Sequence, residues 1–167
     1  EITSESIRII DNFLQQEHLE SPKIHTKTNR FDAIGKLVII LERLKEAHSD
    51  KQFRLKTEEK HMFINADELK FFQIAHNVLS NSVKFTRKNG VIETTVKAYA
   101  KKIEITIKDD GIGIPDELKP FVFEKKSRAG RPGLNGEISN GIGLYVVKKL
   151  YTMLGGTVVL GALFLFI

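Results

Sequence analysis

Two neighbouring runs of alternating apolar and polar residues constrain the fold of this chain most strongly. They are GVIETTVKAYA at 90–100 and KKIEITIKD at 101–109. A period of two is typical of strands that bury one face, and almost nothing separates the two runs. The pattern therefore predicts an antiparallel hairpin whose apolar face must be covered by another layer.

Helical patterns supply such a layer. One begins near Phe31 and places a single apolar stripe at Ile34, Leu37, Val38, Leu41 and Leu44. A third pattern, GIGLYVVKKLYTML at 141–154, predicts a helix that ends at the glycine pair 155–156.

The second helix is expected to run from an N-cap at Asp67 to about Phe85. Its spacing of three and four residues predicts a core-facing stripe of Leu69, Phe72, His76, Leu79 and Val83. On this interpretation His76 is a buried, hydrogen-bonded histidine.

Further strands are expected at 52–57, at 61–65 and in the apolar tail TVVLGALFLFI at 157–167. Helices and mostly antiparallel strands alternate without a regular β-α-β order. The predicted fold class is therefore α+β: a two-layer α/β sandwich with a mixed, mostly antiparallel sheet packed against three helices.

Composition excludes some classes of protein. Without cysteine among its 167 residues the chain has neither disulfides nor thiolate metal sites, which favours a cytoplasmic setting. No apolar run reaches the roughly 20 residues that span a bilayer. Because the chain does not begin with Met, we expect a fragment of a larger protein, with membrane proteins among the candidates. The net charge of +5 is spread over the chain, and no nucleic-acid partner is expected.

The second predicted helix also carries a polar stripe. Asn77, Asn81 and Lys84 are four and three residues apart, so they share one face. An amide oxygen is a ligand that Mg²⁺ accepts beside water and phosphate oxygens, and a lysine adds a cation for a polyphosphate. Taken alone, the stripe also fits a solvent-facing surface.

The stretch DDGIGIP at 109–115 follows the hairpin. A carboxylate at a strand end, such as Asp109, can accept a hydrogen bond from the exocyclic amine of adenine. Gly111 and Gly113 allow a sharp turn and a close approach to a ligand. A simple glycine turn between strand and loop is the alternative.

Gly141 and Gly143 stand at the beginning of the third helix, where backbone N–H groups favour anions. The region 111–140 before it is too long for an ordinary connection and predicts a functional loop. Its basic part would cover a bound nucleotide as a lid.

These motifs occur together and in order, and the chain resembles the catalytic, ATP-binding domain of bacterial sensor histidine kinases, within the GHKL ATPase superfamily. HNVLSNSVKFT at 76–86 is similar to the N box and DDGIGIP to the G1 box. FVFEK at 121–125 is similar to the F box, and NGIGLYVV at 140–147 to the G2 box. The resemblance covers about residues 30–167 and implies the Bergerat fold, with ATP and Mg²⁺ as cofactors.

The resemblance also implies roles for residues. Asn81 would be the Mg²⁺ ligand, with Asn77 and Lys84 at the phosphates. Asp109 would bind the adenine amino group, near Phe85 and Ile114. The remaining nucleotide contacts would be Gly111, Gly113, Gly141, Gly143 and Leu144.

The hydrolytic relatives in this superfamily carry a glutamate one turn before the metal-binding asparagine, as general base. Here that position is Asn77, which cannot take a proton, so the resemblance favours a histidine kinase with Asn81, Asn77 and Lys84 as its catalytic residues. A hydrolytic ATPase and a degenerate binding module without kinase activity are the alternatives. Lys126, where the F box has a second aromatic residue, supports the degenerate module.

No histidine of the chain fits the acceptor pattern of the family. Residues 1–22 would be the end of a dimerisation and phosphotransfer helix with its linker, and 23–167 the catalytic domain with a lid at about 111–140. The expected partners are the histidine-bearing dimerisation domain of the parent kinase and a response regulator downstream.

Overall fold

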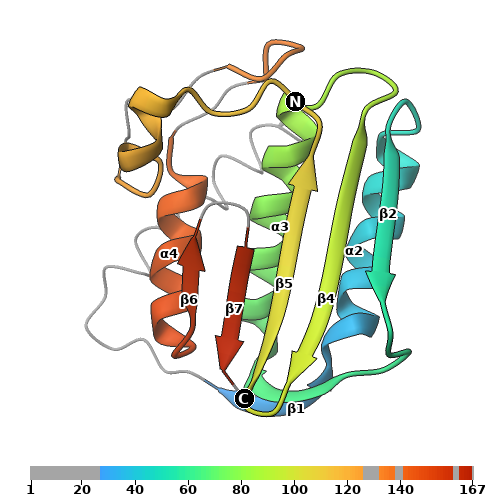
Figure 1. Ribbon diagram of the computed structural model, residues 1–167, viewed down its shortest axis with the longest axis vertical. Helices are drawn as coiled ribbons and strands as arrows, with labels where there is room; N and C mark the ends of the chain where they lie inside the picture. The colour runs from blue at the N-terminus through green and yellow to red at the C-terminus, as the bar shows by residue number, and fades with distance from the viewer. Residues whose placement is uncertain (1–26, 126–131, 138–140, 160–161, 167) are drawn as a thin grey trace, which may run out of the picture.

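The computed structural model describes residues 27–125, 132–137, 141–159 and 162–166. Its main element is a five-stranded sheet in the order β2-β4-β5-β7-β6 (Figure 1). The bounds of these strands are β2 Gln52–Thr57, β4 Val91–Tyr99, β5 Lys102–Asp109, β6 Thr157–Val159 and β7 Ala162–Phe166. The dimerisation helix expected within residues 1–22 and the connection at 160–161 lie outside the described residues, as does Lys126.

The predicted hairpin forms the centre of this sheet. β4 and β5 pair antiparallel with Ile92 opposite Asp109, and β4 also pairs with β2 in parallel. On β5 the residues Ile103, Ile105 and Ile107 are buried while their neighbours are not. The alternation therefore gives the sheet one covered face, and it sets Asp109 in line with that face.

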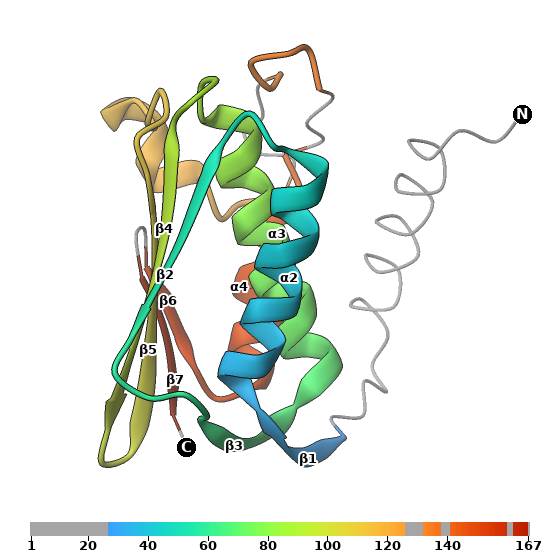
Figure 2. The same cartoon turned by 90° about the vertical axis from the view of Figure 1, so that its right-hand side faces the viewer.

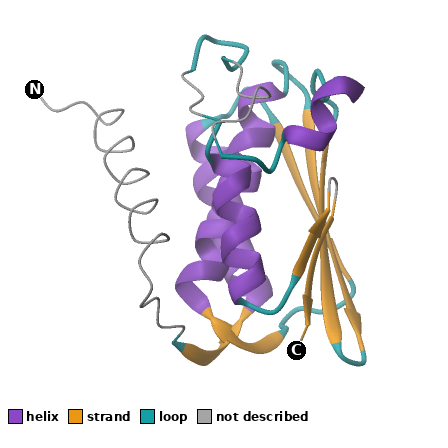
Figure 3. Ribbon diagram, turned by 90° about the vertical axis from the view of Figure 1, so that its left-hand side faces the viewer, coloured by secondary structure: helices purple, strands orange, loops and turns teal. Residues whose placement is uncertain are grey.

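Three helices cover this face, as Figures 2 and 3 show. They are α2 Ala33–Ala47, α3 Glu68–Phe85 and α4 Gly143–Met153. The core between the layers includes Leu37, Ile40, Leu79, Ile92 and Val147. The mixed sheet and its helical layer confirm the predicted fold class.

A small second sheet was not predicted. β1 Thr28–Asp32 pairs antiparallel with β3 Phe63–Asp67, at the end of the helical layer (Figure 3). The segment 28–32 shows no alternation, since Phe31 alone among its residues is buried, and the sequence pattern predicted a helix from about Phe31. The strand expected at 61–65 is found two residues later.

Helix α3 begins at the predicted residue, but the face that it buries differs from the predicted one. The Asp67 carboxylate accepts a hydrogen bond from the Lys70 N–H at 3.1 Å, which confirms the N-cap. The predicted core stripe is wrong in part, because Leu69 is 75 % exposed and His76 is exposed. The residues that α3 buries are Phe71, Ile74, Ala75, Leu79, Ser82 and Val83.

The physical reason lies in two competing apolar patterns on this helix. Phe71, Ile74 and Ala75 place more apolar surface on a face about one residue further round than the predicted stripe. The ring of His76 stacks on Phe72 at 6.2 Å between centroids, outside the core. The prediction of a buried histidine is therefore wrong.

The chain end follows the prediction closely. α4 is closed by Gly155, at φ +71°, and by a hydrogen bond from the Gly156 N–H to the Tyr151 carbonyl at 2.9 Å. β6 and β7 then pair antiparallel, with Val159 opposite Ala162. In the part of the chain that is described, no helix is long and apolar enough to cross a membrane.

Candidate nucleotide site

The ends of several elements meet at one end of the molecule, at the top of Figure 1. They are the carboxyl ends of β5 and α3, the beginning of α4, and the described parts of the region 111–140. The residues that the sequence assigned to the nucleotide lie on these segments, except that Asn77 is near the middle of α3.

The two aspartates of DDGIGIP have different surroundings. The Asp110 carboxylate accepts a hydrogen bond from the Val91 N–H at 2.9 Å, and its own N–H donates to the Val91 carbonyl at 3.2 Å. Asp109 is half-buried, and its Oδ1 accepts the Gly111 N–H at 3.1 Å. Asp110 therefore fixes the start of β4, and Asp109 is the carboxylate that lies in line with the covered face of the sheet.

The loop after Asp109 is attached to the end of α3. The Ile112 N–H donates to the Phe85 carbonyl at 3.0 Å. A Cβ at Gly111 would overlap this same carbonyl and lie 2.8 Å from the Asp109 Oδ1, so the contact requires glycine. Gly113 has open space around it and a φ of +64°, which explains the second glycine.

The polar stripe of α3 faces the first residue of α4. A Cβ built on Gly143 would lie 3.5 Å from Asn81 Nδ2 and 3.7 Å from Asn77 Oδ1. Because Asn77 Nδ2 donates to the Gln73 carbonyl at 2.9 Å, the amide oxygen of Asn77 is its atom nearest Gly143. The structure thus brings together two motifs that are more than sixty residues apart in the chain.

Helix α4 begins in a way that suits an anion. Gly141 has a φ of +63°, and the N-cap residue Ile142 makes no side-chain capping bond. The first-turn N–H groups of a helix carry partial positive charge and have no partner within the helix. Leu144 lies in this first turn and is half-buried.

A second part of the predicted lid is also held by α3. The Leu134 N–H donates to the Lys84 carbonyl at 3.0 Å, next to the carbonyl that holds Ile112. The last carbonyls of a helix have no partner within it, so α3 uses two of them to bind the loop region. Between these anchors the structure describes η1, a short 3₁₀ helix at Asp116–Phe121.

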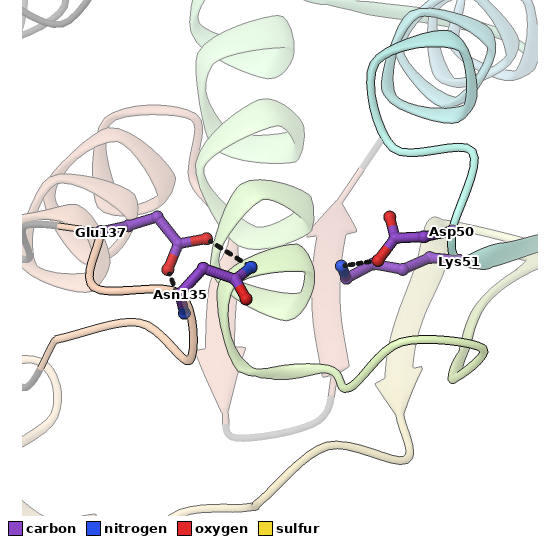
Figure 4. A network of polar contacts seen from close by, with 4 residues as sticks. All are labelled: Asp50, Lys51, Asn135 and Glu137. Atoms are coloured by element: carbon purple, nitrogen blue, oxygen red, sulfur yellow. Dashed lines mark hydrogen bonds and ion pairs between the residues drawn. The ribbon is translucent and has the colours of Figure 1, made fainter.

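Sequence reasoning did not single out four residues beside this end of α3. Asn135 and Glu137 lie on one side of α3 in Figure 4, and Asp50 and Lys51 on the other. The Lys51 side chain is only 3 % exposed, and its Nζ lies 3.0 Å from Asp50 Oδ2. That bond from Lys51 is the main reason why the pKa of Asp50 is below its usual value. A lone lysine in a turn gives no sequence pattern that would have revealed it.

The oxygen atoms at this site suit a hard cation that also binds water or phosphate oxygens. Among the described residues there is no group of three or more histidine, aspartate or glutamate side chains that could hold a metal. Asn81 offers one neutral oxygen beside Asn77, and Mg²⁺ is commonly bound through few protein oxygens together with water and phosphate. These residues therefore fit Mg²⁺ as the companion of a nucleotide.

Comparison with known proteins gives the family. Residues 66–166 match the family described as histidine kinase-, DNA gyrase B- and HSP90-like ATPase. The sensor histidine kinase YclK of Bacillus subtilis is 31 % identical over 160 residues, which are 95 % of this chain and 34 % of that protein. The chain thus spans about a third of the length of this relative.

Two solved structures share the fold. Full-length ShkA in complex with AMPPNP gives a TM-score of 0.77 at 23 % identity, over 95 % of this chain and 34 % of that one. The mycobacterial sensor histidine kinase MprB gives 0.70 at 21 % identity, over 84 % of this chain and 97 % of that one. With the matched segment covering more than half of its length, the chain belongs to the histidine kinase-, gyrase B- and HSP90-like ATPase family, as an ATP-binding catalytic domain of the sensor histidine kinase type.

Proposed function

We propose that this domain binds Mg-ATP and transfers the γ-phosphoryl group to a histidine on the dimerisation region of its parent kinase. One observation carries the proposal: Gly143, at the start of α4, lies against Asn77 and Asn81, while the loop after Asp109 is bound to the end of the same helix. The segments proposed to contact the base and the phosphates are therefore both joined to α3.

At the nucleobase end, Asp109 accepts a hydrogen bond from the adenine amino group. Its Oδ1 already holds the Gly111 N–H, so the carboxylate is oriented before the ligand arrives. Phe85 and Ile114 are both half-buried. Ile114 follows Asp109 in the loop, and the Phe85 carbonyl holds that loop through the Ile112 N–H. Gly111 and Gly113 give the loop the shape that this approach needs.

At the phosphate end, Asn81 provides the amide oxygen for Mg²⁺ and Asn77 a polar contact. Bound Mg²⁺ would supply charge neutralisation at the transferred phosphoryl group. Gly143 and Leu144 present first-turn N–H groups of α4 to the phosphates, and Gly141 shapes the chain just before the N-cap residue Ile142. Lys84, one turn beyond Asn81 on α3, adds a cation.

Transfer to a histidine fits this site better than hydrolysis. Asn77 stands where the hydrolytic relatives carry their general base, and an amide cannot take up a proton. A histidine nitrogen attacks the γ-phosphorus, the bond to the β-phosphate oxygen breaks, and ADP leaves. The protein then contributes mostly position and charge.

The acceptor belongs to the parent protein. We propose that it lies on the dimerisation region, of which residues 1–22 would be the end with its linker, and that a response regulator acts downstream. The domain itself is proposed to act in the cytoplasm, as part of a parent that is soluble or membrane-bound.

Calorimetric titration with a non-hydrolysable ATP analogue tests the site. Asp109→Asn should weaken binding at least tenfold with and without Mg²⁺ (about 1.4 kcal/mol or more), because the amide keeps only one acceptor oxygen for two donors, the Gly111 N–H and the adenine amino group. Asp116→Asn is the matched control, since Asp116 is exposed on η1 and pairs only with Lys119 among the described contacts. No binding to the wild type at millimolar nucleotide would refute the proposal.

The transfer step needs its own test. A separate protein carrying the histidine helix of the parent kinase is mixed with this domain and labelled ATP. Acid-labile phosphohistidine on that helix is the expected product. Steady phosphate release that does not depend on the helix would indicate hydrolysis in place of transfer.

A further inference from the structure

The end of the molecule that lies away from the nucleotide site carries its most exposed hydrophobic side chains. The connection between β4 and β5, the small sheet of β1 and β3 and the start of α3 all lie at this lower end in Figures 1 and 2. Among the large hydrophobic residues of the described segments, the three most exposed belong to these elements: Leu69 at 75 %, Phe63 at 55 % and Tyr99 at 45 %. Single exposed apolar side chains are ordinary, but their gathering at one end marks an interaction surface.

Two of these side chains have a cation over the ring. The guanidinium carbon of Arg30 lies 4.8 Å from the centre of the Phe63 ring, and Lys102 Nζ lies 5.0 Å from that of Tyr99. Such a pair presents an apolar body and a positive charge together at the surface. The same pairing thus occurs on two elements that are far apart in the chain.

The connection between β4 and β5 adds further positive charge. Lys97 and Lys101 are exposed, and neither forms an ion pair within the part of the chain that is described. Lys102 completes a group of three lysines around Tyr99. This connection therefore offers an aromatic ring in a strongly positive setting.

The acidic side chains of this end fall into two groups. Members of the first are bonded within the protein: Asp32 to His61, Asp67 to Lys70, Glu68 to Lys36, and Glu104 to the Tyr99 hydroxyl. The second group is Glu58 and Glu59, which are exposed in the turn between β2 and β3 and are followed by Lys60. A partner that binds this end would meet the three lysines, with Glu58 and Glu59 as the opposing charges.

We propose that this end of the domain binds the surface of a lipid bilayer that contains anionic headgroups. Exposed aromatic and leucine side chains enter the headgroup region, and lysine and arginine side chains are attracted to anionic lipids. A protein partner fits less well, because a specific interface buries about 800 Å² on each side around a packed centre. Here the hydrophobic side chains stand singly on three elements. The nucleotide site, at the other end, stays open to solution.

Sedimentation of the whole chain with vesicles tests this surface. We expect binding to vesicles of phosphatidylcholine and phosphatidylglycerol in equal parts, no binding to phosphatidylcholine alone, and a bound fraction that falls as salt is raised. Lys101→Gln should weaken the binding about fivefold, which is what one lysine contributes near an anionic surface. Lys88→Gln is the matched control, because Lys88 is exposed in the turn after α3 and should leave binding unchanged.

Removal of the opposing acids should have the converse effect. Glu58→Gln combined with Glu59→Gln should strengthen vesicle binding several-fold. Glu117→Gln, on the exposed surface of η1, should not change it. If variants at the two ends of the molecule had equal effects, net charge alone would govern binding and the proposed surface would be wrong.

Fluorescence locates the contact. The chain contains no tryptophan, so a single introduced one reports its own surroundings. Tyr99→Trp and Leu69→Trp place it on two elements of the proposed surface, and Lys88→Trp places it at the other end. With the anionic vesicles the emission of the first two should shift to shorter wavelength, and that of the third should not.

Three results would each overturn the proposal. The wild type could fail to bind the anionic vesicles, or it could bind them while both reporters keep their emission, which would put the contact on another face. Emission of Leu69→Trp at short wavelength without vesicles would show that protein covers this end. None of these measurements involves a nucleotide, so their failure is separate from a failure of the proposed function.

Discussion

The main-chain N–H of Ile112 donates to the carbonyl of Phe85 at 3.0 Å, which joins the loop after the hairpin to the last turn of α3. This bond explains why the preceding residue is glycine. A side chain at Gly111 would stand where that carbonyl lies. The proposed nucleobase end of the site is therefore formed by the helix and the loop together.

Gly111→Ala should therefore destabilise the domain by about 1–3 kcal/mol, the usual cost of forcing an extra carbon into a packed place. It should also weaken ATP-analogue binding, because relief of the overlap moves the loop beside Asp109. Urea denaturation and calorimetric titration measure the two effects.

The companion variant at Gly113 has a different physical basis. Gly113 has open space and a φ of +64°, so Gly113→Asn should cost less than Gly113→Val, since asparagine tolerates the left-handed region. Equal costs for the two, or a harmless alanine at Gly111, would contradict this account of the loop.

The N-cap of α3 makes stability depend on pH. The Asp67 carboxylate is buried, and burial acts to raise its pKa. Bonds from the Lys70 side chain and from the N–H groups of Lys70 and Lys27 outweigh burial and lower the pKa. A carboxylate with a lowered folded pKa stabilises the protein above its unfolded value of about 3.9 and loses this contribution as pH falls through the folded value.

We therefore expect the free energy of unfolding to fall below about pH 4, and Asp67→Asn to flatten that part of the profile. Asp67→Ala should cost about 0.5–2 kcal/mol at pH 7 through the lost cap. Urea denaturation across pH 2.5–7 measures both, and the range of pH is chosen around that value of about 3.9. An identical acid profile for wild type and Asp67→Asn would contradict the role of the cap.

Much of the fold could be read from local pattern. The hairpin is visible as an alternation of apolar and polar residues, and the N-cap of α3 as the aspartate at position 67. The end of α4 is visible as a glycine, which its positive φ favours. In the small sheet only β3 left such a mark, because β1 buries only Phe31. Glu137 and Lys51 were missed for a related reason, since their contacts depend on loops meeting in space.

The face of α3 shows the limit of periodicity. Two apolar stripes fit the same spacing, and only the position of the sheet decides between Leu69 and Phe71.

Leu79→Ala should cost about 2–5 kcal/mol, because the side chain is fully buried. Leu69→Ala makes the same change at an exposed site and should lie within about 0.5 kcal/mol of the wild type. A comparable cost at both positions in urea denaturation would show that the predicted stripe was right after all.

The amide of Asn81 gives the sharpest test of the phosphate end. If its oxygen binds Mg²⁺, Asn81→Ala should remove the gain in ATP-analogue affinity that Mg²⁺ provides and leave the Mg²⁺-free affinity within about twofold, since Asp109 still holds the base. The matched control is Asn65→Ala, on the exposed side of β3 at the other end of the molecule. Because Asn77 Nδ2 is engaged with the Gln73 carbonyl, Asn77 cannot turn to replace the lost ligand without breaking that bond. A full Mg²⁺ effect in Asn81→Ala, measured by paired titrations with and without the metal, would place the metal ligand elsewhere.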